Sequence, residues 1–241
     1  MKCILLSAGK GERLLPYTKK LPKCMIDLGG INLIEFWLKK VSLQDFDEII
    51  INSHHHSEIL KKEILKITNK LSLKNVKVTF EEKLLGTAGT LWSLKDNLND
   101  DFFVINTDVY ANIDLESMRS AFFEKNLLCL IATDFREDTK GCGKVVFNSE
   151  FKIKQFSEKD HDNKPGFVYS GILIFSKKIF EFLPFKEFIS QNYTGLDTGY
   201  DVFPKILNFM GGHKLENRVI DLRDEEKLFE LKRYILKKGK L

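Results

Sequence analysis

The chain has 241 residues, 43% hydrophobic and 30% charged, which suits one large domain or two small ones with a substantial core. This composition excludes disordered and fibrous chains. The net charge of +4, from 38 basic and 34 acidic residues spread along the chain, does not by itself indicate a nucleic-acid partner.

Short apolar runs alternate with amphipathic stretches through the first half of the chain. We predict strands at residues 2–6, 48–51, 76–80 and 102–105, separated by helices at 33–41, 57–71 and 87–98. Strand and helix alternating at this spacing are typical of βαβ units on a mostly parallel sheet. Such sheets bind ligands at the carboxyl ends of their strands, so the loops after the strands are the candidate binding segments.

Beyond residue 126 the pattern changes. We predict strands at residues 127–132, 144–147, 151–156 and 167–175, and helices at 177–182, 202–209 and 225–237. There is no internal repeat and no linker. We therefore expect a single α/β domain over residues 1–241, more antiparallel in residues 127–241 than in residues 1–126.

The cysteines and the N-terminus bear on the compartment. Cys3, Cys24, Cys129 and Cys142 show no CxxC spacing, so we expect reduced thiols. The apolar run near the N-terminus is too short for a signal peptide, and no stretch approaches the roughly 20 apolar residues of a membrane span. We expect a soluble, cytoplasmic protein with no membrane partner.

The first predicted strand leads directly into a glycine loop, Ser7-Ala8-Gly9-Lys10-Gly11. Glycines let backbone N–H groups approach a phosphate closely. Position 14 is Leu14, not the third glycine of a dinucleotide-binding fingerprint, and Gly-Lys is not followed by the Ser or Thr of a Walker loop. By itself the loop is also compatible with an ordinary turn.

The segment that follows the glycines continues the pattern as GxGxRLxPxTxxxPKxM over residues 9–25. Arg13 offers a planar fork for phosphate oxygens, and Lys23 offers a compact positive charge. Pro16 and Pro22 stiffen the segment, which lowers the cost of ordering both cations around an anion.

This pattern resembles the signature of the sugar-1-phosphate nucleotidylyltransferases, or nucleotide-sugar pyrophosphorylases, and is most similar to their mannose- and heptose-1-phosphate guanylyltransferases. The resemblance implies a Rossmann-like, mixed, mostly parallel sheet flanked by helices, with residues 1–126 mainly binding nucleotide and residues 127–241 mainly binding the sugar phosphate. The nucleotide-binding residues that it implies in this segment are Ser7, Ala8, Gly9, Gly11, Arg13 and Lys23. Arg13 and Lys23 are also implied to be catalytic.

Two further segments resemble the nucleotide and metal sites of the family. Residues 84–91 (LLGTAGTL) match a segment whose glycine and threonine, here Gly86 and Thr87, lie against the base; a helix start capped by Thr87 is the alternative. Asp108 follows the fourth predicted strand and is implied to bind nucleotide and Mg²⁺ and to act in catalysis. Asp221 is implied to be a second Mg²⁺ ligand, but the sequence after it departs from the family pattern, so a helix cap is its alternative role.

The sugar side of the resemblance lies in the second half of the chain. The implied sugar-phosphate-binding residues are Gly143, Glu158, Lys159, Tyr169 and Gly171. Glu158 would accept from sugar hydroxyls, and Lys159 would hold the sugar phosphate as a catalytic cation. Tyr169-Ser170-Gly171 stands where the family often has Asn-Ala-Gly, which leaves the sugar open. We assign the histidine run 54–56 a structural role, because three consecutive side chains cannot easily share one ion.

The implied reaction joins a nucleoside triphosphate, with GTP favoured, to a sugar 1-phosphate in the presence of Mg²⁺. Uridylyl or cytidylyl transfer is an alternative, also to a non-sugar acceptor such as phosphocholine. A catalytically silent nucleotide-sugar sensor or regulatory subunit is a further alternative. A nucleic-acid-binding protein is not indicated, because no basic and aromatic cluster is present. The oligomeric state, a homodimer included, stays open.

Overall fold

The computed structural model describes residues 1–159, 164–182, 195–217 and 219–238. They form two compact units. Unit 1 consists of Met1–Leu84, Ile105–Ala111 and Val219–Leu241, and unit 2 consists of Leu85–Val104 and Asn112–Arg218. Each unit therefore combines segments from distant parts of the sequence. The predicted division of roles between residues 1–126 and 127–241 stays a prediction.

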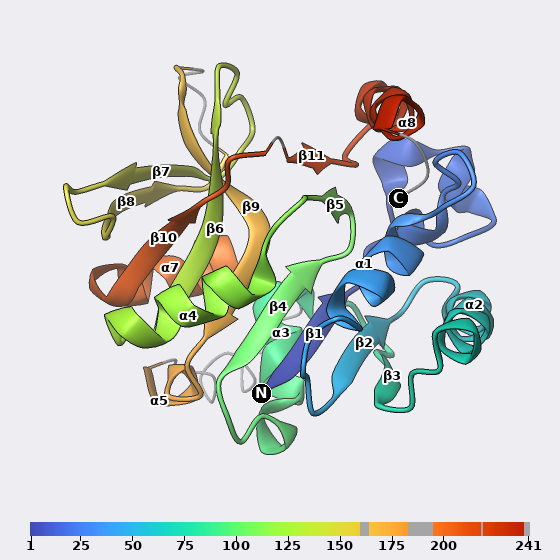
Figure 1. Ribbon diagram of the computed structural model, residues 1–241, viewed down its shortest axis with the longest axis horizontal. Coiled ribbons are helices and arrows are strands. Elements are labelled where there is room, and N and C mark those ends of the chain that lie inside the picture. Colours follow the sequence, from blue (N-terminus) through green and yellow to red (C-terminus); the bar gives the residue numbers. More distant parts are fainter. Residues whose placement is uncertain (160–163, 183–194, 218, 239–241) are drawn as a thin grey trace. The chain divides into compact units, whose positions relative to one another are not determined.

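Unit 1 is built on parallel strands with helices beside them (Figure 1). Its strands β1 (Lys2–Leu6), β2 (Ile49–Ser53) and β3 (Val76–Phe80) pair in parallel, and α1 (Leu33–Val41) and α2 (Ser57–Leu71) connect them. Buried apolar side chains fill β1 and β2 because both strands are interior. The βαβ alternation predicted from the sequence is confirmed in this unit.

Helix α1 is held in place at both its start and its buried face. The Asn32 side chain caps the helix by accepting from the Glu35 N–H at 2.9 Å. Trp37 is fully buried, and its Nε1 donates to the Val109 carbonyl at 2.7 Å. This bond ties α1 to the short strand β5 (Val109–Tyr110), which follows β4 (Phe102–Asn106).

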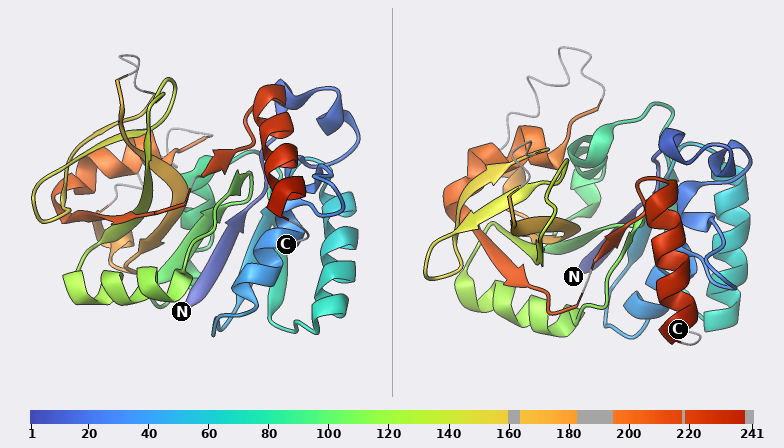
Figure 2. Two further views of the ribbon diagram at one scale, coloured as in Figure 1. Left: turned by 45° about the horizontal axis from the view of Figure 1, so that its top comes forward. Right: turned by 90° about the horizontal axis from the view of Figure 1, so that it is seen from above.

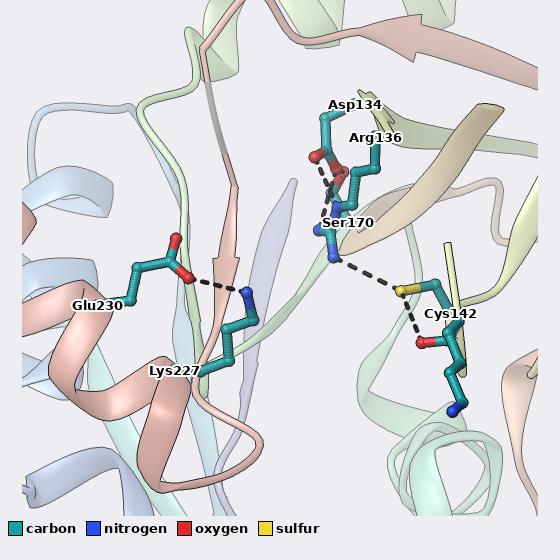
Figure 3. Close-up of polar contacts among 7 residues, drawn as sticks. Asp134, Arg136, Cys142, Ser170, Lys227 and Glu230 are labelled. Carbon is teal, nitrogen blue, oxygen red and sulfur yellow. Dashed lines mark hydrogen bonds and ion pairs between the residues drawn. The ribbon is translucent and has the colours of Figure 1, made fainter. Parts of the chain in front are cut away.

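The end of the chain returns to unit 1 through β11 (Ile220–Asp221) and α8 (Glu225–Lys238). Strand β11 pairs antiparallel with β5. A hydrophobic cluster joins α8 to the segment after β1; its buried members are Leu14, Ile26, Leu28, Ile31, Leu33, Tyr110, Ile220, Leu222, Leu228, Leu231 and Ile235. On α8 itself, Lys227 and Glu230 form an ion pair of 2.8 Å (Figure 3). The C-terminal helix therefore braces the segment that carries the predicted phosphate-binding cations.

Unit 2 contains a mixed sheet. Its strands are β6 (Cys129–Arg136), β7 (Lys144–Phe147), β8 (Ile153–Ser157), β9 (Gly166–Phe175) and β10 (Met210–Lys214). The β6–β9, β7–β8 and β7–β9 pairs are antiparallel, and β10–β6 is parallel. Helix α4 (Leu115–Lys125) lies along β6 and β10, as Figure 2 shows. The unit also contains α3 (Gly86–Ser93), α5 (Ile179–Phe182) and α7 (Phe203–Ile206).

The predicted fold class, a mixed α/β protein with a more antiparallel second half, is confirmed, but several elements were not predicted. They are α4, β5, β10 and β11. Strands of two residues, such as β5 and β11, carry no periodicity, and β10 contains Gly211 and Gly212, which are unfavourable in strands. The helix predicted at 87–98 is α3 followed by a one-turn 3-10 helix, Lys95–Asn97. Among the described residues, no helix has the length and apolarity that a bilayer crossing requires.

Candidate active site

The glycine loop begins directly after β1, at the carboxyl edge of the parallel strands in unit 1. Ser7 and Ala8 are buried, whereas Gly9 is exposed, and a Cβ added to Gly9 would meet no atom within 4 Å. The Ser7 N–H donates to the Asn52 Oδ1 at 2.6 Å, so this donor points into the protein. The exposed part of the loop therefore starts at Gly9.

The loop then turns sharply at Gly11, which has a φ of +66°. The Thr18 hydroxyl donates to the Gly11 carbonyl at 2.9 Å. A Cβ at Gly11 would lie 2.8 Å from Thr18 Cγ2 and 3.2 Å from Lys23 Cβ. Glycine is thus required here both for backbone conformation and for close packing, and it brings the stem of Lys23 against the loop.

Three one-turn 3-10 helices, Glu12–Leu14, Tyr17–Lys19 and Lys23–Met25, carry the predicted cations of this segment. Arg13 is exposed, while the Lys23 side chain is only 14% exposed. Leu14 is buried in the cluster under α8, which anchors the residue beside Arg13. The proline-stiffened segment predicted from the sequence is therefore folded as a series of tight turns.

Lys23 lies against the carboxylate of Asp108, which follows β4. The distance from Lys23 Nζ to Asp108 Oδ2 is 2.7 Å. Cys24, the next residue after Lys23, is buried, and this burial raises the pKa of its thiol to about 12. The structure therefore brings together Gly11, Lys23 and Asp108, three of the residues predicted for nucleotide binding.

Asp221 lies on the strand that pairs with the residues after Asp108. Asp221 is opposite Val109 in the β11–β5 ladder, and the Leu222 N–H donates to the Asp108 carbonyl at 2.8 Å. Two carboxylate residues thus come from directly paired segments. Mg²⁺ takes one or two protein carboxylates and completes its shell with phosphate oxygens and water, so Asp108 and Asp221 are residues of the type that such an ion binds.

The histidine run lies at the start of α2. His54 Nδ1 is 2.8 Å from the Glu81 carbonyl oxygen, and His56 Nε2 is 3.2 Å from the Thr18 carbonyl oxygen. Within the described residues, no group of three or more His, Cys, Asp and Glu side chains gathers as it would around a metal ion. The rings of His54 and His56 thus contact backbone carbonyls of neighbouring segments, consistent with the structural role that we assigned to the run.

In unit 2, the predicted base-binding segment forms the start of α3. Gly86 has a φ of +76°, and a Cβ there would collide with the Leu196 carbonyl, which also accepts from the Ala88 N–H at 2.9 Å. The Thr87 hydroxyl is bonded to the segment around Thr198, whose N–H donates to it at 2.8 Å. The helix cap is Leu85, so Thr87 is not the capping residue considered from the sequence.

Glu158 lies between two glycines of unit 2. A Cβ at Gly143 would be 3.2 Å from Glu158 Oε2, and a Cβ at Gly199 would collide with the same oxygen. Burial raises the pKa of Glu158 to about 7, and the Asp197 charge adds to the rise while Lys159 lowers it. The predicted hydroxyl acceptor therefore sits in a confined, partly desolvated position.

Among the other predicted sugar-side residues, Tyr169 and Gly171 lie on β9, and Lys159 follows β8. The Tyr169 N–H donates to the Gly143 carbonyl at 2.8 Å, and the Tyr169 ring packs on Phe203. Gly171 is buried, with a φ of +72°, at the place where the β6–β9 register shifts. Lys159 is exposed, and its Nζ lies 5.5 Å from the centroid of the Tyr200 ring.

A polar cluster supports the loop that contains Gly143 (Figure 3). The buried Asp134 carboxylate accepts from the Arg136 Nε and the Ser170 hydroxyl, both at 2.8 Å. The Arg136 guanidinium also reaches the Cys142 sulfur at 3.6 Å. Side chains from strands β6 and β9 thereby hold Cys142, the residue before Gly143, in place.

Sequence reasoning missed Asn52 and Asp197, which contact predicted residues, and Glu81, which contacts Asn52. The Asp197 carboxylate accepts from the Thr87 hydroxyl at 3.2 Å and caps the π-helix Thr198–Val202. Asn52 ends a run of isoleucines, so the strand-end rule that selected Asp108 could have found it. For Glu81 and Asp197 no local pattern marks the contact.

The chain is similar to several known proteins. A family model described as "Nucleotidyl transferase" matches residues 2–217. A D-glycero-alpha-D-manno-heptose 1-phosphate guanylyltransferase of Campylobacter jejuni is 28% identical over 209 residues, covering 84% of this chain and 91% of that protein. A bifunctional protein GlmU of Methanocaldococcus jannaschii is 29% identical over 183 residues, covering 76% of this chain and 42% of that protein. A UTP--glucose-1-phosphate uridylyltransferase of Synechocystis is 28% identical, covering 86% of this chain and 55% of that protein. The chain thus spans about half the length of the last two relatives.

Solved structures with the same fold include HddC from Yersinia pseudotuberculosis, with a TM-score of 0.81 and 21% identity over 97% of this chain and 99% of that chain. The CTP:phosphocholine cytidylyltransferase of Streptococcus pneumoniae has a TM-score of 0.76 and 20% identity over 97% of this chain and 98% of that chain. At these identities the likeness shows the fold alone.

Proposed function

Because the chain belongs to the nucleotidyl transferase family, we propose that it joins a nucleoside triphosphate to a sugar 1-phosphate, releasing pyrophosphate. A phosphate oxygen of the sugar 1-phosphate bonds to the α-phosphorus, and the bond from that phosphorus to the leaving pyrophosphate breaks. A phosphate monoester has a second pKa of about 6, so the nucleophile is already anionic at neutral pH. No general base is required of the protein.

The observation that carries this proposal is the Lys23–Asp108 pair beside the glycine loop. The ammonium and the carboxylate are 2.7 Å apart, and the stem of Lys23 packs near Gly11. A cation and a metal-binding carboxylate that lie this close can act on the same phosphate group. Lys23 would then stabilise charge at the α-phosphate, where preorganised electrostatic contacts have their largest effect.

Arg13 and the exposed Gly9 face would bind the rest of the triphosphate, with Ser7 and Ala8 supporting the loop. Asp108 and Asp221 would hold Mg²⁺, which when bound neutralises charge on the phosphate oxygens. The pairing of β11 with β5 supports a joint role for the two carboxylates, because it places Asp221 opposite Val109, the residue after Asp108.

In unit 2, Gly86 and Thr87 would contact the base. Glu158 would accept from sugar hydroxyls, and the exposed Lys159 would bind the sugar phosphate. Gly143, Tyr169 and Gly171 would shape this sugar site. The confinement of Glu158 between Gly143 and Gly199 supports its role, because it fixes one carboxylate oxygen for directional hydrogen bonds.

GTP is our preferred triphosphate and a hexose or heptose 1-phosphate our preferred acceptor. Support comes from the Campylobacter guanylyltransferase, which this chain matches over 91% of its length. UTP is the alternative that the Synechocystis relative suggests. CTP with phosphocholine rests only on a shared fold.

The test is a pyrophosphate-release assay in which GTP, UTP, CTP and dTTP are each combined with a panel of sugar 1-phosphates and with phosphocholine. We expect Mg²⁺-dependent release with GTP and one sugar 1-phosphate, and none with Asp108→Asn. Release with phosphocholine but with none of the sugar 1-phosphates would show that the acceptor is not a sugar phosphate. If the protein binds a nucleotide sugar but no combination releases pyrophosphate, the result would favour a silent sensor and overturn the enzymatic proposal.

A further inference from the structure

A network of buried polar residues lies along the carboxyl edge of the parallel strands, beneath the glycine loop. Asn52 lies near the end of β2, Glu81 follows β3, Ser7 follows β1 and Thr107 follows β4. Each of the four is at most 8% exposed. All of them belong to unit 1, and Thr107 directly precedes Asp108.

The hydrogen bonds of this network give the Asn52 side chain one orientation. Its Nδ2 donates to Glu81 Oε1 at 2.8 Å, and its Oδ1 accepts from the Ser7 N–H at 2.6 Å. The Ser7 N–H can only donate, so it requires the amide oxygen on its side, and the amide nitrogen then donates to the Glu81 carboxylate. Ser7 and Glu81 together determine which atom of Asn52 meets the loop.

The same network of hydrogen bonds continues to the segment that carries Asp108. The Ser7 and Thr107 hydroxyl oxygens are 3.0 Å apart, and the Thr107 hydroxyl donates to the Leu6 carbonyl at 2.8 Å. The start of the glycine loop and the residue before Asp108 are therefore joined by one hydrogen-bonded path. Burying polar groups costs free energy unless each is bonded, so such a path is sensitive to the loss of one partner.

We propose that Asn52 and Glu81 are positioning residues that hold the glycine loop in the conformation that binds the triphosphate. This inference rests on the proposed function. By binding the Ser7 N–H inward, Asn52 sets where the loop leaves the strand and so where the exposed Gly9 stands. Neither residue needs to touch the nucleotide in this role.

Polarity exchange tests the proposal. Asn52→Asp places a second carboxylate against Glu81, which removes the donor and introduces repulsion. Glu81→Gln in that background supplies an amide that can donate to the new aspartate, whose other oxygen can accept from Ser7. Glu81→Gln alone keeps an oxygen that can accept from Asn52, so it should perturb the loop less than Asn52→Asp.

The matched control is Asn75→Asp. The Asn75 Nδ2 donates to the Phe46 carbonyl at 2.7 Å in the same unit, at the start of β3 and away from the loop. This variant loses a comparable bond of a structural asparagine. It should lower the melting temperature without changing affinity for a nucleoside triphosphate.

Two measurements are made on the full chain for all four variants. The Kd for Mg²⁺–GTP and for the other nucleoside triphosphates should rise about tenfold or more in Asn52→Asp, and should recover to within about threefold of wild type in the double variant. Hydrogen exchange of the loop amides without ligand should become about tenfold faster in Asn52→Asp only.

An Asn52→Asp protein with wild-type exchange in the loop would overturn the proposal. So would a folded double variant that recovers neither exchange nor affinity. If no triphosphate binds to the wild type, the proposed function fails, while the ligand-free exchange still decides whether Asn52 and Glu81 hold the loop.

Discussion

Lys23 and Asp108 form an ion pair of 2.7 Å although they are 85 positions apart in the sequence. Lys23 comes from the turns after the glycine loop, and Asp108 follows β4. The Lys23 side chain is 14% exposed and that of Asp108 is 36% exposed, so water screens the pair only in part. The pair defines the place where we expect the α-phosphate and the metal ion to meet.

Lys23→Ala should lower kcat/KM by roughly two orders of magnitude, because it removes one preorganised electrostatic contact. This corresponds to a loss of about 3 kcal/mol of transition-state stabilisation. Steady-state kinetics with the preferred substrates measures the loss. Lys66→Ala, which removes an exposed lysine of α2, is the control and should leave kcat/KM unchanged. Turnover close to wild type in Lys23→Ala would remove Lys23 from the mechanism.

Asp108→Asn should abolish Mg²⁺-dependent turnover while the protein stays folded. The amide keeps the size of the side chain but loses the charge that Mg²⁺ requires. Rates are measured over a Mg²⁺ titration after removal of metal with a chelator, and circular dichroism reports the fold. Asp96→Asn, at an exposed position of the 3-10 helix Lys95–Asn97, is the matched control. Activity in Asp108→Asn at wild-type Mg²⁺ concentrations would contradict the metal assignment.

Gly9→Ala tests whether the exposed face of the loop approaches the nucleotide. The added Cβ meets no protein atom within 4 Å, so the free energy of unfolding should change by less than about 1 kcal/mol. The KM for the triphosphate should nevertheless rise by about tenfold, because the methyl group stands where phosphate oxygens approach. An unchanged KM would place the triphosphate elsewhere.

Glu158→Gln should change how stability depends on pH. Burial raises the pKa of Glu158 from 4.5 to about 7, so between these values the folded state binds a proton that the unfolded state has lost. The wild type therefore loses stability as the pH rises from about 4.5 to about 7, and the neutral variant does not. After allowance for solvent screening, the stability of Glu158→Gln relative to wild type should increase by about 1 to 2 kcal/mol between pH 5 and pH 8.

Urea unfolding at the two pH values measures this difference. Glu150→Gln, which replaces an exposed carboxylate of the same unit, should show no such change. Equal pH dependence in Glu158→Gln and wild type would show that Glu158 titrates normally and is well hydrated.

The local sequence was sufficient for the strands and α-helices up to residue 80. Strand β1, helices α1 and α2 and strand β3 begin and end at the predicted residues, because strong apolar periodicity determines each of them. Helix α4 and strand β10 were missed. Strand β10 contains two glycines, and its place depends on pairing with β6, a partner about 80 residues away.

The sequence by itself determined which residue types are available for chemistry: a glycine loop, two cations at set spacing, and aspartates after strands. Only the tertiary structure decided that Lys23 pairs with Asp108, that β11 aligns Asp221 beside β5, and that Asn52 and Glu81 hold Ser7. Only it raised the pKa of Glu158, through burial and the charge of Asp197. Local spacing and periodicity report the conformation of a short segment, whereas ion pairs, burial and pKa values depend on residues that folding brings together from distant positions.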